Sequence, residues 1–490
     1  MEWVYNFFVE LYILINVLCL FVVCLKIDKR GKKYCVNVTR FIYPFACLIL
    51  LCALILLYKI KPSVDILDCL SSISNDALSY FAKFWTLSTS LACFLFMWTY
   101  CREGNIRKYE FIFLFFFAII GLLIIASSSS TAIMYLGIEL QSLCFYILAT
   151  LKFNSNISIE AGVKYFLVGI TSSAMLLFGI SMLYGITGVV AFQELEMLFN
   201  SNLIYSKIKP NLMGFFLIYC GIFFKLGIVP FHMWVADIYE GAPIHVTFFF
   251  SVVPQVGFIS LILRLNNIFI DIFYNEISMI FLILSILSIF VGTLGAIYQT
   301  KLRRILAFSS ISHMGYILSM LLITDIAGMF FVIFYIVIYT VISLGLWSFI
   351  LHFRNNSNRI EFKDMDNIAL LYKSNKYISI FFFIFLFSVM GVPPLLGFFS
   401  KFFVLLNVVE LEMYFFAIFL IIINSISVFY YLRLIKKMFS SNMDKSLFLS
   451  NMSVWLAFYY IVLIILNVSF FLYPSIFCII IKKIVLFFFK

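Results

Sequence analysis

Charged residues are scarce in this sequence. Asp, Glu, Lys and Arg make up 12% of its 490 residues, about half the share typical of soluble proteins, whereas 64% of the residues are apolar. A water-soluble domain of this size would need more charged side chains on its surface. The mean hydropathy of +1.11 instead indicates a chain that lies mostly in a lipid bilayer. Disorder, nucleic-acid binding and a secreted disulfide scaffold are therefore excluded.

Motifs that bind metals or nucleotides are also missing. The eleven cysteines include no CxxC pair and mostly lie within apolar runs, so we interpret them as small core residues. Iron–sulfur clusters need thiolates at short spacings, and nucleotides need a glycine-rich phosphate loop. We therefore expect no metal site, no cofactor and no catalytic residue for redox chemistry on this chain.

Apolar runs long enough to cross a bilayer, about 20 residues each, divide the chain into about fourteen segments. The predicted fold class is thus an all-α polytopic membrane protein. The first run lacks a basic leading segment and a small-residue cleavage site, so no signal peptide is expected. The stretch 474–490 is expected to be a short fifteenth element or an interfacial tail. The predicted helices cover residues 5–25, 41–58, 82–100, 109–128, 129–151, 161–187, 210–230, 243–263, 276–298, 304–324, 327–352, 376–404, 411–434 and 453–473.

The distribution of basic residues supports this count. Loops after odd-numbered helices hold twenty-two Lys and Arg, whereas loops after even-numbered helices hold six, including Lys83 and Arg264. Short loops on the cytoplasmic or matrix side retain basic residues. The net charge of +11 therefore reflects membrane orientation, and both termini are expected on the outer side.

Four ionisable residues fall within the predicted spans: Glu139, Lys225, His313 and Lys401. An ionised group at mid-bilayer costs about 2.5–3.5 kcal/mol on insertion scales, so such groups usually face protein or water and serve a function. The alternatives are a packing carboxylate, lysines at helix ends whose ammonium groups reach the interface, and a satisfied core histidine.

Three of only nine prolines lie near these lysines. Pro230 follows Lys225, and Pro393 and Pro394 precede Lys401. A proline within a span interrupts the helix and frees a carbonyl, which is tolerated only next to protein or water. We therefore predict that helices 7 and 12 are interrupted; simple packing kinks are the alternative.

The two polar pairs have similar spacing. Glu139 and Lys225 are 86 residues apart, and His313 and Lys401 are 88 apart, so a shift of five helices relates the pairs. An odd shift turns the second copy upside down in the membrane, which is the inverted-repeat plan of transporters. The predicted regions are 1–108 with helices 1–3, 109–264 with a first five-helix repeat (helices 4–8), 275–434 with the inverted repeat (helices 9–13), and 435–490 with helix 14 and a tail.

Several runs carry a specific resemblance. They are LGIELQSLCFYILA (136–149), EAGVKYFLVGITSSAMLLFGISMLYGITG (160–188), KLGIVPFHMWVADIYEGAP (225–243), KLRRILAFSSISHMGYIL (301–318) and GVPPLLGFFSKFFVL (391–405). Over roughly residues 109–434 the chain resembles the subunit 2 family of NADH:ubiquinone oxidoreductase, the antiporter-like membrane subunits of respiratory complex I. ELQSLCFY and MWVADIYEGAP are more similar to subunit 2 than to subunits 4 or 5.

The resemblance implies a proton-translocating subunit of the mitochondrially encoded type, located in the mitochondrial inner membrane. Redox chemistry would take place in other subunits, which would bind NADH, FMN, iron–sulfur clusters and ubiquinone. The implied partners are subunits 4 and 4L, the long lateral helix of subunit 5, and lipids.

The resemblance also implies a proton relay. The family's helix-5 carboxylate matches Glu139 and pairs with the helix-7 lysine, which matches Lys225. His313 matches the helix-10 histidine, and Lys401 matches the helix-12 lysine. An ammonium beside a carboxylate in a low dielectric keeps its proton, so changing the separation or charge of Glu139 and Lys225 would load and release protons.

One position departs from the family. Relatives usually have a lysine on helix 8 in an SxxPK pattern, where this chain has Gln255, which cannot titrate but can organise a water. His245, ten residues earlier, is the nearest titratable residue and is expected to lie too near the helix end to replace the lysine. We favour a subunit that pumps protons. The alternatives are a scaffold subunit with a non-conducting channel, a stand-alone cation/proton antiporter, and the equivalent subunit of a plastid complex.

Other polar residues predict local contacts. Glu160 and Lys164 lie four residues apart and are expected to form a helical ion pair worth about 0.3–0.5 kcal/mol. Asp237 and Glu240 are expected to shape a loop beyond the break in helix 7. Residues 353–376 are expected to form a polar linker or a docking surface.

Overall fold

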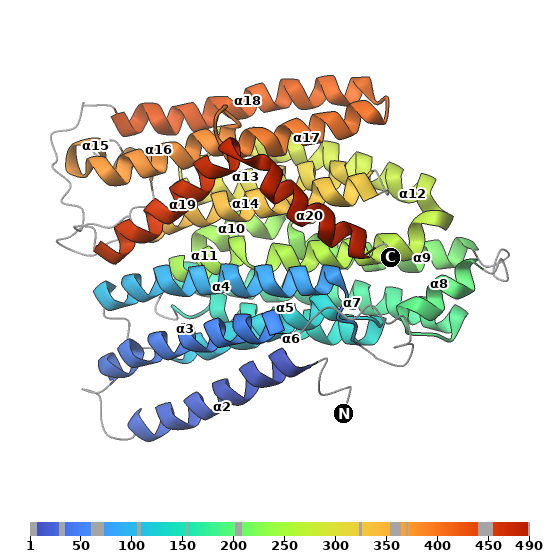
Figure 1. Ribbon diagram of the computed structural model, residues 1–490, viewed down its shortest axis with the longest axis horizontal. Helices are drawn as coiled ribbons and strands as arrows, with labels where there is room; N and C mark the ends of the chain where they lie inside the picture. Colours follow the sequence, from blue (N-terminus) through green and yellow to red (C-terminus); the bar gives the residue numbers. More distant parts are fainter. Residues whose placement is uncertain are drawn as a thin grey trace. The chain divides into compact units, whose positions relative to one another are not determined.

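The computed structural model is helical over nearly all of the chain that it describes (Figure 1). The described residues are 7–28, 35–59, 73–104, 109–152, 155–200, 208–322, 326–352, 364–368, 371–439 and 454–488. Among them, eleven helices are long and apolar enough to cross a membrane. The predicted class, an all-helical polytopic membrane protein, is therefore confirmed. Residues 353–363 of the predicted polar linker lie outside the described ranges.

The chain divides into two compact units. Unit 1 comprises Met1–Gly227, Gly241–Ser278 and Ile484–Lys490, and unit 2 comprises Ile228–Glu240 and Met279–Lys483. The helices of unit 1 are α2 (Phe8–Asp28), α3 (Cys35–Lys59), α4 (Ala77–Gly104), α5 (Glu110–Ser127), α6 (Thr131–Ala149), α7 (Asn156–Thr187), α8 (Phe192–Asn200), α9 (Ile208–Leu226), α11 (Ile244–Val252) and the first part of α12 (Pro254–Tyr298).

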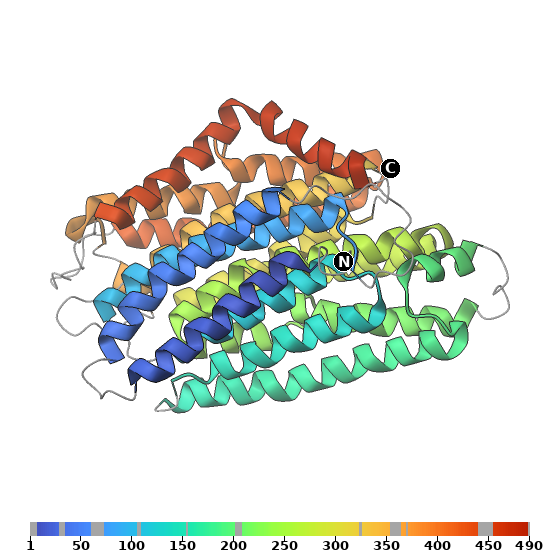
Figure 2. The ribbon, with the colours of Figure 1, turned by 60° about the horizontal axis from the view of Figure 1, so that its bottom comes forward.

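Unit 2 contains the rest of α12 and the segment that follows the break after α9. Its further elements are α10 (Met233–Gly241, up to Glu240), α13 (Leu302–Met320), α14 (Ile326–His352), η2 (Met365–Ile368), α15 (Leu371–Ser374), α16 (Lys376–Met390), α17 (Leu396–Glu410), α18 (Tyr414–Phe439), α19 (Val454–Leu472) and α20 (Pro474–Phe488, up to Lys483). In Figure 1, α16 and α17 follow one another along α18, and in Figure 2 α19 and α20 meet at a sharp bend.

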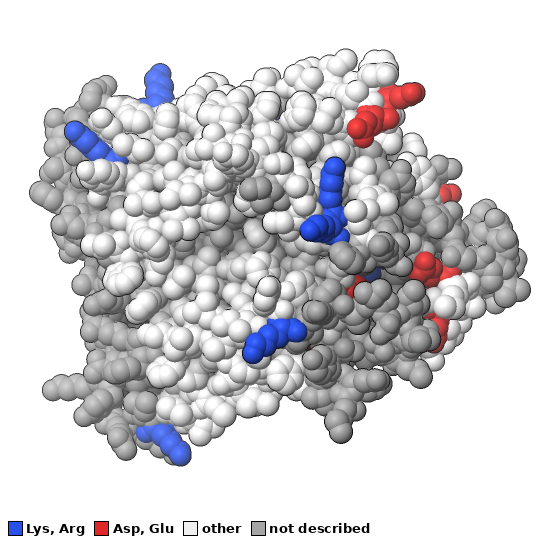
Figure 3. All heavy atoms as spheres, in the orientation of Figure 1, with Lys and Arg blue, Asp and Glu red and all other residues white. Residues whose placement is uncertain are grey.

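Burial, rather than hydropathy, distinguishes the inner helices from the outer ones. In the most apolar part of the span Ile244–Ile268 every residue is buried, and in that of α14 94% of the residues are, whereas in that of α7 only 33% are, although its hydropathy is similar. A helix that is apolar on all sides suits the interior of a bundle as well as lipid. The face shown in Figure 3 accordingly has a wide uncharged area with few described Lys, Arg, Asp or Glu side chains.

Small residues bring helices close together in unit 1. A Cβ added at Gly179 of α7 would lie 2.6 Å from the carbonyl oxygen of Gly214 in α9. Backbones that approach this closely are typical of helix packing in membranes, where dispersion contacts replace the hydrophobic effect.

Both predicted helix interruptions are confirmed. Helix 7 stops at Leu226, turns through Gly227 with φ +72°, and resumes as α10 beyond Pro230. Helix 12 stops at Met390, turns through Gly391 with φ +84°, and resumes as α17 beyond Pro393 and Pro394. Positive φ favours glycine at both turns because glycine has no Cβ to clash there.

Helix 8 begins at Ile244, one residue from the predicted start, but differs from the prediction in its middle and at its end. It is interrupted as well, because α11 ends at Val252 and α12 begins at Pro254, which has no N–H to continue the helix. The prediction of a loop over residues 264–275 is wrong, because α12 continues through this stretch. That stretch is polar but contains no glycine or proline, so nothing in it breaks the helical hydrogen bonds.

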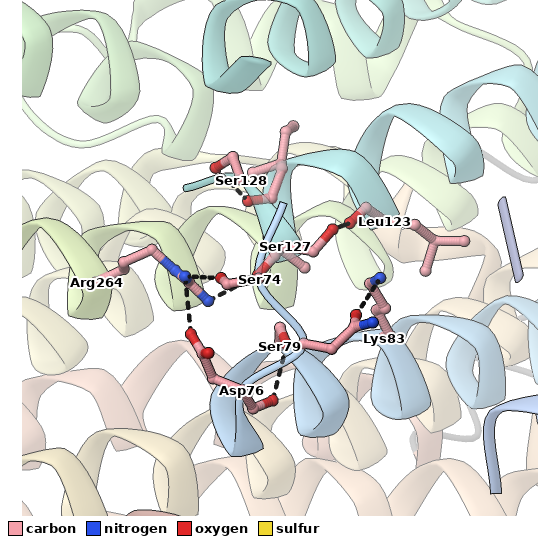
Figure 4. Close-up of polar contacts among 11 residues, drawn as sticks. Ser74, Asp76, Ser79, Lys83, Leu123, Ser127, Ser128 and Arg264 are labelled. Carbon is pink, nitrogen blue, oxygen red and sulfur yellow. Dashed lines mark hydrogen bonds and ion pairs between the residues drawn. The ribbon is translucent and has the colours of Figure 1, made fainter. Parts of the chain in front are cut away.

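Lys83 and Arg264, expected in loops, are instead buried in α4 and α12. Figure 4 shows the polar cluster around them in unit 1. The Arg264 guanidinium pairs with Asp76 at 3.0 Å and donates to the Ser74 hydroxyl. Lys83 pairs with Glu10 of α2 at 2.7 Å, with both side chains at least 96% buried. These contacts join the N-terminal helices to the rest of unit 1.

Two smaller predictions concern the cysteines and a helical ion pair. Five of the cysteines are buried as expected, but Cys19 and Cys52 are exposed on the apolar outer surface, where a thiol suits lipid as well as a core. Glu160 and Lys164 form the predicted i,i+4 ion pair at 2.8 Å on an exposed face of α7.

Candidate functional site

Helix α6 carries Glu139 at its centre. The hydroxyl of Ser130 caps the helix by accepting from the N–H of Ile133, and the apolar run that follows continues the helix to Ala149. The Oε1 atom of Glu139 is buried and has no hydrogen-bond partner. A carboxylate oxygen in this state is poised to accept a proton or a cation, because burial without a partner is costly.

Lys225 lies in the last turn of α9, two residues before the turn at Gly227. Its side chain is 8% exposed, and its ammonium donates to the Tyr146 hydroxyl at 3.1 Å while lying 5.4 Å from the centre of that ring. Lys225 is also within electrostatic range of Glu139. The structure therefore brings the two predicted residues near one another in unit 1, but the ammonium contacts a phenol rather than the carboxylate.

The helix-8 residues are buried in unit 1. Gln255 occupies the first turn of α12, directly after the break, and its Oε1 has no hydrogen-bond partner. His245 is the second residue of α11, as its predicted place near the helix end requires, and its ring packs 5.1 Å from Phe111 and 5.9 Å from Tyr100. His245 thus has an aromatic environment.

Lys401 is the buried cation of unit 2. Its ammonium donates to the carbonyl oxygen of Met390 at 2.9 Å and to Asn424 Oδ1 of α18 at 2.6 Å. Met390 ends α16, so the break at Gly391 frees the carbonyl that Lys401 uses. The proline-rich interruption and the lysine are therefore parts of one arrangement.

His313 of α13 lies among buried tyrosines of the same unit. Its Nδ1 is 2.7 Å from the hydroxyl of Tyr335, and its ring packs 5.0 Å from Tyr339 and 6.2 Å from Tyr316. It is also within electrostatic range of Lys401.

Both lysines are associated with the C-terminal end of a half-helix, but in different ways. Lys225 lies in the C-terminal turn of the half-helix α9, and the Lys401 ammonium lies at the C-terminal carbonyl of the half-helix α16. The C-terminus of a helix carries partial negative charge, which stabilises a cation. The Lys401 ammonium thus lies where the carbonyl terminus of α16 faces protein, whereas the Lys225 ammonium contacts the Tyr146 phenol.

Asp237 and Glu240 are not in a loop. They lie in α10, where Asp237 pairs with Arg304 at 2.9 Å and Glu240 pairs with both Arg304 and Lys301. These contacts tie α10 to the start of α13 within unit 2. These ion pairs join residues that are more than 60 positions apart, so no local sequence pattern predicted them.

Several polar residues of the site were not predicted. Asn424 and Asn467 are amides within apolar spans, and that signal could have identified them; Asn467 Oδ1 accepts from Ser388 and from the N–H of Leu396 at the start of α17. Tyr146 and Tyr335 gave no such signal, because the chain has 28 tyrosines and an apolar run tolerates each of them.

Each unit contains groups that are suited to holding a proton. Unit 1 has the Glu139 carboxylate and the Lys225 ammonium on a phenol, and unit 2 has the His313 imidazole beside a phenol and the Lys401 ammonium on a carbonyl and an amide. Within the described ranges no group of three or more His, Cys, Asp or Glu could hold a metal ion.

Comparison with known proteins agrees with this geometry. Residues 128–427 match the family model described as NADH:quinone oxidoreductase/Mrp antiporter, TM. The chain is 35% identical to NADH-ubiquinone oxidoreductase chain 2 of Marchantia polymorpha over 82% of this chain and 81% of that protein. It is 36% identical to NADH-quinone oxidoreductase subunit N 1 of Rhizobium meliloti over 74% and 75%, respectively.

Solved structures share the fold. A chain of respiratory complex I from Thermus thermophilus has a TM-score of 0.77 at 21% identity, covering 96% of this chain and 98% of that one. A chain of the membrane-bound sulfane sulfur reductase, an archaeal respiratory membrane complex, has a TM-score of 0.83 at 20% identity, covering 99% and 98%.

Proposed function

Because this chain belongs to the NADH:quinone oxidoreductase and Mrp antiporter family, and within it to the subunit 2 (subunit N) branch of complex I, we propose that Glu139, Lys225, His313 and Lys401 carry the protons that it translocates. The chain is a proton-translocating membrane subunit of NADH:quinone oxidoreductase. The electron transfer that drives it takes place in other subunits.

One observation carries the proposal. Each unit has a buried lysine beside an interrupted helix, and each ammonium is hydrogen-bonded to neutral oxygens rather than to a carboxylate. A structural cation in a membrane would be expected to have an acidic partner at contact distance, because an unpaired buried charge is costly. An ammonium on neutral acceptors can release its proton without leaving a carboxylate unpaired.

The finer architecture and setting belong to the same proposal. We propose fourteen transmembrane helices, with helices 4–8 and 9–13 as inverted repeats, and a place in the mitochondrial inner membrane. The partners would be subunits 4 and 4L and the lateral helix of subunit 5. NADH, FMN, iron–sulfur clusters and ubiquinone would be bound elsewhere in the complex.

The test is to replace Glu139 and Lys225 separately in the assembled complex. Glu139→Gln and Lys225→Met keep approximate volume and remove the charge, so NADH-driven acidification of sealed vesicles is expected to fall by about tenfold or more, consistent with losing a charged group. NADH oxidation by a water-soluble artificial acceptor is the control and is expected to be unchanged. Full proton translocation in both variants would overturn the proposal.

A scaffold role is the second candidate, and Gln255 is the observation that favours it. A glutamine cannot hold the proton that a lysine would carry at this place on helix 8. This reading predicts normal proton stoichiometry after Lys401→Ala, with assembly lost only when packing faces are altered. Measuring protons translocated per NADH in that variant separates the two candidates.

A further inference from the structure

Tyr146 lies on the same face of α6 as Glu139. The two residues are seven positions apart, which is close to two helical turns. Lys225 of α9 donates to the Tyr146 hydroxyl and lies within electrostatic range of Glu139. The phenol oxygen accepts from the ammonium, whereas the carboxylate has a buried oxygen without a hydrogen-bond partner. Lys225 thus has one occupied and one unoccupied acceptor, both supplied by one helix.

Helix α7 fixes the position of the phenol. A Cβ added at Gly169 would lie 2.0 Å from the Tyr146 hydroxyl oxygen, so the hydroxyl fits only because residue 169 has no side chain. The ring of Tyr165 packs edge-on against the Tyr146 ring at 4.8 Å. Packing therefore holds the hydroxyl in place beside Lys225.

On the basis of the proposed function, we propose that Tyr146 is a positioning residue that holds the proton-bearing ammonium of Lys225 away from Glu139. A buried ammonium needs an acceptor, and a neutral phenol provides one without the strong attraction of a carboxylate. The separated arrangement is thereby a stable state of the site. Moving the ammonium from Tyr146 to Glu139 gives the paired state, in which the proton is held more tightly.

The first test is Tyr146→Phe in the assembled complex. This change keeps the ring and its packing and removes only the oxygen that contacts Lys225. NADH-driven proton translocation is expected to fall by about tenfold, the size expected for a lost hydrogen bond to a charged group. Tyr184→Phe, at a 55% exposed position on α7, is the matched control and is expected to be unchanged. Gly169→Ala displaces the hydroxyl and is expected to reproduce the loss.

The second test separates positioning from packing. If the phenol acts by keeping Lys225 from Glu139, it has little effect once the carboxylate is gone. Adding Tyr146→Phe to Glu139→Gln is therefore expected to change the residual translocation rate by less than about twofold, because the two residues act on one group. The proposal would be overturned if the double variant lost the product of the two single-variant losses in translocation rate. It would also be overturned if the single variant Tyr146→Phe translocated protons at the wild-type rate.

These outcomes are distinct from failure of the proposed function. Normal translocation in both Glu139→Gln and Lys225→Met would show that the site carries no protons. Loss of translocation in those variants, with a normal rate in both Tyr146→Phe and Gly169→Ala, would reject only the positioning role.

Discussion

At the scale of single residues, conspicuous charges were predictable and their neutral partners were not. Glu139, Lys225 and Lys401 stand out because each is an ionisable group in an apolar run. Tyr146 contacts Lys225 across 79 residues of sequence, and the phenol looks like any other aromatic residue of an apolar span. Which side chain accepts a hydrogen bond from a buried ammonium depends on tertiary structure, and local sequence composition does not reveal it.

The contact between Asn424 and Lys401 gives a residue-scale prediction. Asn424→Leu removes the acceptor at 2.6 Å and leaves the Met390 carbonyl to hold the ammonium. A hydrogen bond to a charged group is worth about 1.5–3 kcal/mol, so proton translocation is expected to fall by about tenfold or more while the complex still assembles. The control is Ser425→Ala, an exposed neighbour on α18. Unchanged translocation in Asn424→Leu would show that the amide has no part in proton transfer.

At the scale of elements, prolines and glycines decided where prediction succeeded. The breaks after α9 and α16 were predicted because proline lies close to a lysine. The break before Pro254 was not predicted. A proline is enough to interrupt the helix there, but no ionisable residue lies beside it, and the prediction had used only prolines near lysines. The loop predicted over 264–275 relied on polarity alone, and polar side chains do not end a helix that has no proline or glycine.

The turn at Gly391 gives a prediction for an element boundary. Its φ of +84° is unfavourable for alanine, and an added Cβ would lie 3.0 Å from Cδ of Lys401. Gly391→Ala is expected to cost about 1–2 kcal/mol of stability and to displace the lysine, lowering both the thermal stability of the complex and its proton translocation. Gly185→Ala is the matched control, because its Cβ would meet nothing within 4 Å. Equal effects of the two changes would contradict this account.

The pairing of α2 with α4 gives a second prediction at this scale. Lys83→Met leaves Glu10 charged and buried without its partner, which is expected to cost about 3–5 kcal/mol. The double variant Glu10→Leu/Lys83→Met removes both charges and is expected to be more stable than the single variant. Thermal unfolding of the purified complex compares them. A double variant less stable than Lys83→Met would show that the unpaired Glu10 carboxyl group is not the cause of the loss.

At the scale of the whole molecule, the fold extends further than the recognisable sequence. The family model covers residues 128–427, whereas the likeness to solved structures covers 96% or more of the chain. The membrane class could be predicted from composition because hydrophobic runs are required wherever a chain crosses lipid. Composition could not predict which helices are internal, because lipid and protein interior favour the same residues.

Charge along α18 gives a whole-molecule prediction of orientation. Glu412 precedes this helix, and Lys436 and Lys437 lie in its last turn, as expected if its end faces the matrix or cytoplasm. In sealed right-side-out vesicles, whose matrix or cytoplasmic side faces inward, Glu412→Cys is expected to react with an added membrane-impermeant maleimide, and Lys436→Cys only after the vesicles are opened. The reverse labelling would invert the orientation.

The buried pair of Glu10 and Lys83 also constrains how the chain is made. Lys83 is synthesised 73 residues after Glu10, which at about 5–20 residues per second is a delay of about 4 to 15 s. Throughout this interval Lys83, the partner of Glu10 in the folded chain, has not yet been made, so the ion pair between α2 and α4 cannot form while α2 and α3 are being synthesised. The order of synthesis thus places the pairing of α2 with α4 after α4 itself has been made.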